Sequence, residues 1–170
     1  KMAAWINANA ENGASVAVLK DALASLINYL SFAVVVLVIC AATGDFIKGL
    51  VGLTAIPLLR YFSGGIHLKS SVHCMLVSAC FVLLAVYISP YFEFLYTGLI
   101  MNAVSILLVL IYAPAGIDGL SRLDRKHYPK IKAVAVLIVA SNFIWMSPYV
   151  SMLFLGQALT LPMTRLKMFS

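Results

Sequence analysis

The chain alternates long apolar stretches with short polar breaks, a pattern that predicts a bundle of membrane-spanning helices. A bilayer core of about 30 Å is crossed by about 20 helical residues. The stretches that approach this length are 23–43, 46–62, 72–89, 92–112, 131–147 and 149–164. Because lipid offers the backbone no water to bond with, these stretches are expected to be helices. The predicted fold class is an all-α membrane protein with about six transmembrane helices.

Two of the stretches and the N-terminal segment depart from this simple pattern. The second and sixth stretches are short and contain Pro57 and Pro162, which predict a kink or a partly re-entrant path. Segment 2–20 mixes apolar with polar residues and is typical of an amphipathic helix that lies on the membrane surface. We therefore expect a single polytopic membrane domain over residues 1–170, with an amphipathic segment at 1–22 and the helical bundle at 23–165.

Composition supports this interpretation and excludes several classes of protein. Hydrophobic residues make up 63% of the chain and charged residues 11%, whereas a soluble domain carries about 25% charged residues. Soluble globular and disordered proteins are therefore excluded. The net charge of +6 indicates cytoplasmic loops and anionic lipid headgroups. No basic stripe interleaved with aromatic residues favours nucleic acid, so membrane lipids are the expected partner and nucleic acid is not.

The positions of the basic residues orient the spans. If the N-terminus lies in the cytoplasm and the chain crosses the membrane six times, all of the 12 lysine and arginine residues except Lys48 fall on the inner side. Cytoplasmic loops of membrane proteins carry this excess of positive charge. Both termini and the loops 63–71 and 113–130 are then predicted to face the cytoplasm.

The residues that could carry chemistry gather between the second and third spans. Gly64 and Gly65 break the second span, and Ser70 or Ser71 is a candidate N-cap for the third. Cys74 is then expected within the first two turns of a helix, where the positive end of the helix dipole favours a thiolate. Since the thiolate is the nucleophilic form of cysteine, Cys74 is a candidate catalytic residue.

Two histidines could act as the base for this thiol. The side chain of His73 should diverge from its neighbour Cys74 by about 100° around a helix. His67 precedes Cys74 by seven residues, and on one continuous helix the two would lie about 10 Å apart, beyond the ~3 Å that a base requires. A Cys74–His67 pair therefore needs non-helical backbone somewhere in 64–70. The alternatives are a cysteine that only packs and a histidine that is only solvated.

A metal site is the third interpretation of the same residues. His67, His73 and Cys74 have spacings that match no familiar zinc pattern, and no glutamate lies nearby as a general base. No metal and no cofactor is expected.

The same segment resembles the signature of a known family. Arg60, Gly64-Gly65, His67, Lys69 and Cys74, in this order and spacing, are similar to the signature of AgrB, the accessory gene regulator B family of Gram-positive bacteria. An amphipathic N-terminal segment, a Tyr112-Ala113-Pro114 element before a basic loop and a short C-terminal tail extend the resemblance. The run 115–120 differs from the richer proline and asparagine content expected there.

The resemblance implies a function and assigns residues to it. AgrB proteins are cysteine endopeptidases of the bacterial cell membrane that cleave the AgrD pro-peptide and promote its cyclisation to a thiolactone or lactone signal for quorum sensing. Cys74 would be the nucleophile, His67 its base, and an AgrD-like pro-peptide the substrate and partner, with the active site on the cytoplasmic side. Candidate substrate-binding residues are Arg60, Lys69, Ser70, Ser71, Arg122, Arg125 and Lys126. The basic loop residues among them could equally hold lipid headgroups, and Arg60 could simply reach the membrane interface.

Other features leave alternatives open. Asp118 and Asp124 are candidates to orient His67 or are simply solvated. The polar residues within the spans are expected to form interhelical hydrogen bonds: Asn28, Asn102, Asn142 and Gln157. Small residues in two spans are compatible with close helix packing or with a homodimer. A transporter or a non-enzymatic signalling component is the competing class of function, although a transport path would require ionisable residues that the span centres almost entirely lack.

Overall fold

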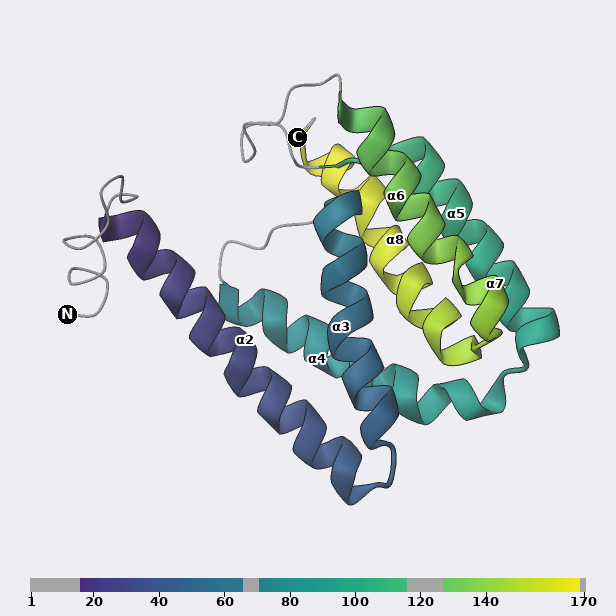
Figure 1. The fold of residues 1–170 in the computed structure, drawn as a ribbon, viewed down its shortest axis with the longest axis horizontal. Coiled ribbons are helices and arrows are strands. Elements are labelled where there is room, and N and C mark those ends of the chain that lie inside the picture. Colours follow the sequence, from purple (N-terminus) through teal and green to yellow (C-terminus); the bar gives the residue numbers. More distant parts are fainter. Residues whose placement is uncertain (1–15, 66–70, 116–126, 169–170) are drawn as a thin grey trace.

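The computed structural model describes residues 16–65, 71–115 and 127–168, and over these ranges the chain is helical (Figure 1). The elements are α2 (Val16–Ala42), α3 (Phe46–Ser63), α4 (Ser71–Ile88), the 3-10 turn η1 (Ser89–Tyr91), the π-helical turn η2 (Phe94–Gly98), α5 (Leu99–Tyr112), α6 (Tyr128–Ala140), α7 (Asn142–Trp145) and α8 (Pro148–Met168). The predicted all-α membrane fold is confirmed.

Six spans were predicted, and in the described part of the chain four of them correspond to helical segments long and apolar enough to cross a membrane, while the other two fall in α4 and α8. Among the described residues, the segments long and apolar enough to cross a membrane are Ala22–Ala42, Phe46–Ser63, Phe94–Tyr112 and Tyr128–Trp145, and Met75–Tyr91 is a shorter apolar helix. Most of the predicted amphipathic segment 2–20 lies outside the described residues. Its last residues, 16–20, belong to α2, so the expected boundary at residue 22 falls inside one continuous helix.

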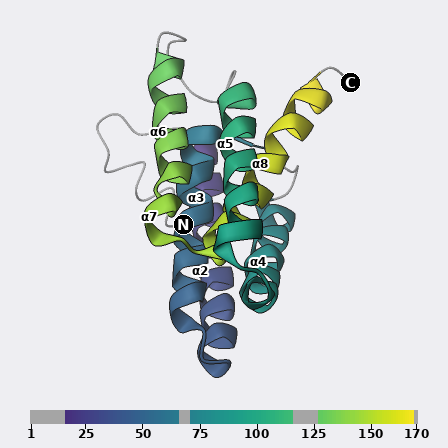
Figure 2. The same cartoon turned by 90° about the vertical axis from the view of Figure 1, so that its right-hand side faces the viewer.

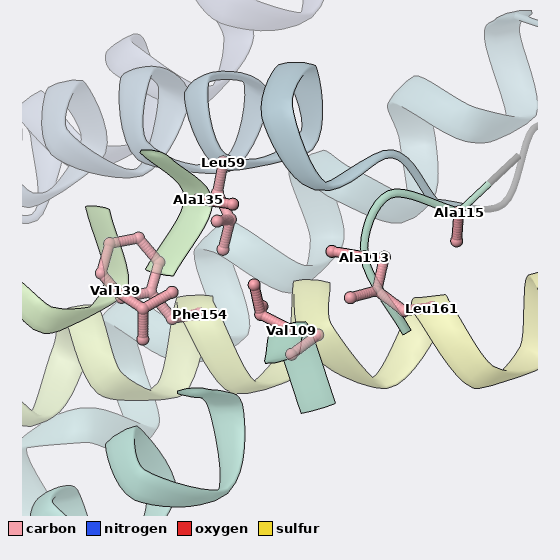
Figure 3. Close-up of a cluster of buried hydrophobic side chains, with 9 residues drawn as sticks. Leu59, Val109, Ala113, Ala115, Ala135, Val139, Phe154 and Leu161 are labelled. Carbon is pink, nitrogen blue, oxygen red and sulfur yellow. The ribbon is translucent and has the colours of Figure 1, made fainter. Parts of the chain in front are cut away.

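The core of the bundle lies where α3, α5, α6 and α8 meet (Figures 1 and 2). Small and branched side chains fill it, and Figure 3 shows Leu59, Val109, Val139 and Leu161 interleaved from these helices. A second buried cluster joins α2 and α4 to α3 and α8. These two clusters hold the last helix, α8, against both halves of the bundle.

The helices continue through both prolines, and a side chain compensates for one of them. Pro57 lacks the N–H that would bond to the carbonyl of Leu53 one turn earlier. The Tyr29 hydroxyl of α2 donates to the Leu53 carbonyl oxygen at 2.7 Å instead. The α2–α3 pair is therefore joined at the point where α3 loses a backbone hydrogen bond.

Interhelical hydrogen bonds of the expected kind occur in the buried part of α5, α7 and α8. The Asn102 amide donates to the Val139 carbonyl oxygen at 3.2 Å. The Asn142 amide donates to Ser151 Oγ at 2.8 Å and to the Ser147 carbonyl oxygen at 3.1 Å. The Asn142 amide bonds fix the turn between α7 and α8. The candidate site lies at the opposite end of the bundle.

The ends of α3, α5 and α8 and the start of α6 gather at one end of the bundle (Figure 1). Arg60 lies in the last turn of α3 and Lys130 in the first turn of α6, while Lys48 pairs with Asp45 at 2.8 Å at the start of α3, at the other end. Helix α4 crosses the direction of α3 and α8 (Figure 1). In that view its first residues lie lower than the last residues of α3. As a whole, α4 contacts α2, α3 and α8, whereas Val72 and His73 in its first turn are exposed.

Candidate functional site

The candidate site begins where α3 ends in a double glycine. Gly64 has φ 75° and ψ −154°, and Gly65 has φ 144°, backbone conformations that side-chain-bearing residues rarely adopt. A Cβ on Gly64 would collide with the Ala115 carbonyl oxygen, and one on Gly65 would lie 3.0 Å from Gln157 Nε2. Both conformation and space therefore require glycine. The backbone is non-helical here, which meets the condition that a Cys74–His67 pair imposes.

The double glycine is paired with the start of the basic loop. The Gly65 N–H donates to the Ala115 carbonyl oxygen at 3.1 Å, and the Ala115 N–H donates to the Ser63 carbonyl oxygen at 3.0 Å. Together they form an isolated parallel bridge between Gly64 and Ala115, and these residues are buried. The two connections that were predicted to face the cytoplasm are therefore tied together at their first residues.

A side chain of α8 supports the same turn from inside the bundle. Gln157 Nε2 donates to the Gly64 carbonyl oxygen at 2.9 Å, and Gln157 is only 4% exposed. Ser63 Oγ donates to the same oxygen at 3.2 Å. Sequence reasoning foresaw an interhelical hydrogen bond from Gln157 but missed its partner. The sequence contains two indications of this contact: an amide side chain in the last span, which needs a hydrogen-bond partner, and a double glycine, whose backbone carbonyls need hydrogen-bond donors.

The candidate nucleophile lies in the first turn of the next helix. Cys74 is the fourth residue of α4, directly after the backbone N–H groups that have no partner within the helix, and the dipole there favours an anion. Ser71 is already the first residue of α4, so it lies within the helix and not before it. His73 is exposed.

Several predicted site residues lie outside the part of the chain that the structure describes: His67, Lys69, Ser70, Arg122, Arg125 and Lys126, together with Asp118 and Asp124. The pairing of His67 with Cys74 and the role of the basic loop remain predictions.

Arg60 and Lys132 are two described basic residues that lie near the site connections. Arg60 is half-buried in the last turn of α3, and its carbonyl oxygen accepts a hydrogen bond from the Gly64 N–H at 2.9 Å. Lys132 Nζ donates to the Leu110 carbonyl oxygen at 2.9 Å. Because that carbonyl lies in the last turn of α5, Lys132 caps the C-terminus of this helix, and its positive charge interacts favourably with the negative end of the helix dipole.

The other two cysteines lie in ordinary packing positions. Cys40 is fully buried, and its side chain faces Gly49 at the α2–α3 contact. Cys80 is exposed on α4. A thiol in an apolar span behaves as a small hydrophobic group.

Comparison with known proteins gives one match. The family described as AgrB, Accessory gene regulator B, matches residues 1–168. No curated protein and no solved structure matches the chain.

Proposed function

Since the chain belongs to the AgrB family, whose members process autoinducing peptides, we propose that it is a membrane cysteine endopeptidase with Cys74 as nucleophile and His67 as base. The observation that supports this best is the break in the helix at Gly64–Gly65, followed by a new helix with Cys74 in its first turn. A break of this kind is what allows a histidine seven residues before the cysteine to return over the helix start.

The proposed reaction has two acyl-transfer steps. The Cys74 thiolate attacks a peptide carbonyl of an AgrD-like pro-peptide, and the protonated His67 gives its proton to the leaving amine, which releases the C-terminal part. The peptide is then held as a thioester. A cysteine or serine side chain of the peptide, deprotonated by His67, attacks the thioester, closes a thiolactone or lactone ring and regenerates the Cys74 thiolate.

Ring closure competes with hydrolysis of the thioester. Exchange of one thioester for another is nearly thermoneutral, whereas hydrolysis is strongly downhill, so the site has to exclude water. Formation of a thioester from an amide is itself uphill, and removal of the released tail would draw the pathway forward.

The developing oxyanion needs preorganised donors. Free backbone N–H groups in the first turn of α4, around 72–74, are the simplest candidates, since they are rigid and already oriented. The Ser70 and Ser71 hydroxyls are the second choice.

The acidic C-terminal part of the peptide needs positive charge close to the nucleophile. We assign this role to Arg60 and Lys69 and to the basic loop residues Arg122, Arg125 and Lys126. The bridge between Gly64 and Ala115 supports the assignment, because it starts the basic loop beside the segment that leads to His67. On this proposal both termini and the site face the cytoplasm, where the pro-peptide is made.

A cleavage assay tests the proposal directly. Membranes carrying the wild-type chain are incubated with a peptide that has an internal cysteine and an acidic tail, and the tail is quantified by mass spectrometry. Cys74→Ala and His67→Ala should abolish cleavage, whereas the matched controls Cys80→Ala and His73→Ala should retain it. Equal cleavage in all of these proteins would refute the pair.

A further inference from the structure

Gln157 makes a buried polar contact at this end of the bundle. Its amide nitrogen lies 2.9 Å from the Gly64 carbonyl oxygen, and the two residues are separated by 93 positions in the sequence. A buried carbonyl in a strained turn requires a hydrogen-bond donor. Because the donor comes from α8, the turn after α3 is held by an element that belongs to neither connection.

The part of α8 that carries Gln157 is packed into the core of the bundle. Its neighbours Ala158 and Leu161 are fully buried in the core cluster that also contains Leu59 of α3. A side chain fixed on such a helix can impose a position on a loop, since close-packed interiors transmit displacement.

The turn that Gln157 supports begins the connection between α3 and α4, which carries His67 and is called the catalytic segment below. Gly64 precedes His67 by three residues, and Gly65 is bonded in turn to Ala115. The position of the Gly64 carbonyl therefore fixes where the chain leaves α3 on its way to His67.

We propose that Gln157 is a positioning residue for the Cys74–His67 pair, acting through the Gly64 carbonyl. The inference rests on the proposed function. It assigns to the last helix a part in setting the distance between base and nucleophile, without contact with the substrate.

Asn102 provides a matched control. Like Gln157 it is a buried amide that donates to a backbone carbonyl of another helix, here Val139 at 3.2 Å, but it lies at the other end of the bundle. Gln157→Met removes the donor from α8 with little change of shape and leaves only the Ser63 hydroxyl, 3.2 Å from the Gly64 carbonyl oxygen. Gln157→Asn keeps an amide that is too short to reach. Asn102→Leu should weaken packing without moving the catalytic segment.

The experiment measures kcat and KM for the acidic-tailed peptide, and the rate at which iodoacetamide alkylates Cys74 across the pH range. A misplacement on the order of 1 Å costs about a hundredfold in rate, so Gln157→Met should lower kcat by about tenfold to a hundredfold with KM nearly unchanged. Alkylation of Cys74 near neutral pH should slow, with an altered pH profile. Gln157→Asn should show a smaller loss, and Asn102→Leu neither effect.

Two results separate the inference from the proposed function. If Cys74→Ala is inactive but both Gln157 variants keep the kcat and alkylation profile of Asn102→Leu, the positioning role is refuted and the endopeptidase stands. If Cys74→Ala still cleaves, the proposed function fails and this inference fails with it.

Discussion

The hydrogen bond from Tyr29 to α3 should stabilise the bundle mainly because Pro57 leaves the Leu53 carbonyl without its backbone donor. The Tyr29 hydroxyl lies 2.7 Å from the Leu53 carbonyl oxygen, which the missing N–H of Pro57 would otherwise have bonded. Interhelical hydrogen bonds in membranes contribute about 0.6 kcal/mol on average, and up to about 1.7 kcal/mol. Because this bond is short and its acceptor is half-buried, Tyr29→Phe should lower the free energy of unfolding by about 1 kcal/mol.

A double-mutant cycle isolates the cause. Pro57→Ala restores an N–H that can bond to the Leu53 carbonyl within α3, so in that background Tyr29→Phe should cost well under half as much. The assay is reversible unfolding in mixed micelles with increasing denaturing detergent, followed by circular dichroism. Tyr61→Phe is the control, since Tyr61 is 80% exposed and should contribute little. An equal cost of Tyr29→Phe in both backgrounds would refute the compensation.

Three further predictions concern the site and its orientation. Gly64→Ala should abolish cleavage and destabilise the protein by about 1–3 kcal/mol, because alanine would have to adopt a backbone conformation that is strained for it, with its Cβ against the Ala115 carbonyl oxygen. Unaltered cleavage would show that the turn can relax. Lys132→Met should cost about 0.3–1 kcal/mol at low salt through loss of the α5 cap, whereas Lys130→Met in the same unfolding assay should cost less. A thiol reagent confined to the outside of intact cells should label Tyr91→Cys, at an 85% exposed position between α4 and α5, and not Cys74; the reverse pattern would overturn the predicted sidedness.

The helices could be predicted from the sequence because lipid leaves the chain few options. Apolar runs of sufficient length, ended by glycine, proline and charge, match the segments Ala22–Ala42, Phe46–Ser63, Phe94–Tyr112 and Tyr128–Trp145 to within a few residues. The helix break between α3 and α4 was also foreseen, since Gly64 and Gly65 mark it directly. The start of α2 at Val16 was not, because the polar residues ahead of the span read as a separate surface helix.

Long-range partners could not be predicted. Pairing of Gly64 with Ala115 uses backbone groups alone, and such a pairing leaves no pattern in the side chains of two glycines and an alanine. For Gln157 the sequence indicates a need for a partner but not which carbonyl satisfies it. The same holds for Tyr29, whose hydroxyl compensates for a proline 28 positions away in another helix.

The contact of α8 with the double glycine bears on when the protein becomes active during its synthesis. Gln157 is translated long after Cys74, and it reaches the Gly64 carbonyl only when α8 has inserted beside α3 and α5. On the proposed function, a nascent chain with its first helices already in the bilayer would contain the nucleophile Cys74 without the hydrogen bond from Gln157 to Gly64. Premature attack on peptide bonds by half-made chains would be suppressed by the order of translation itself.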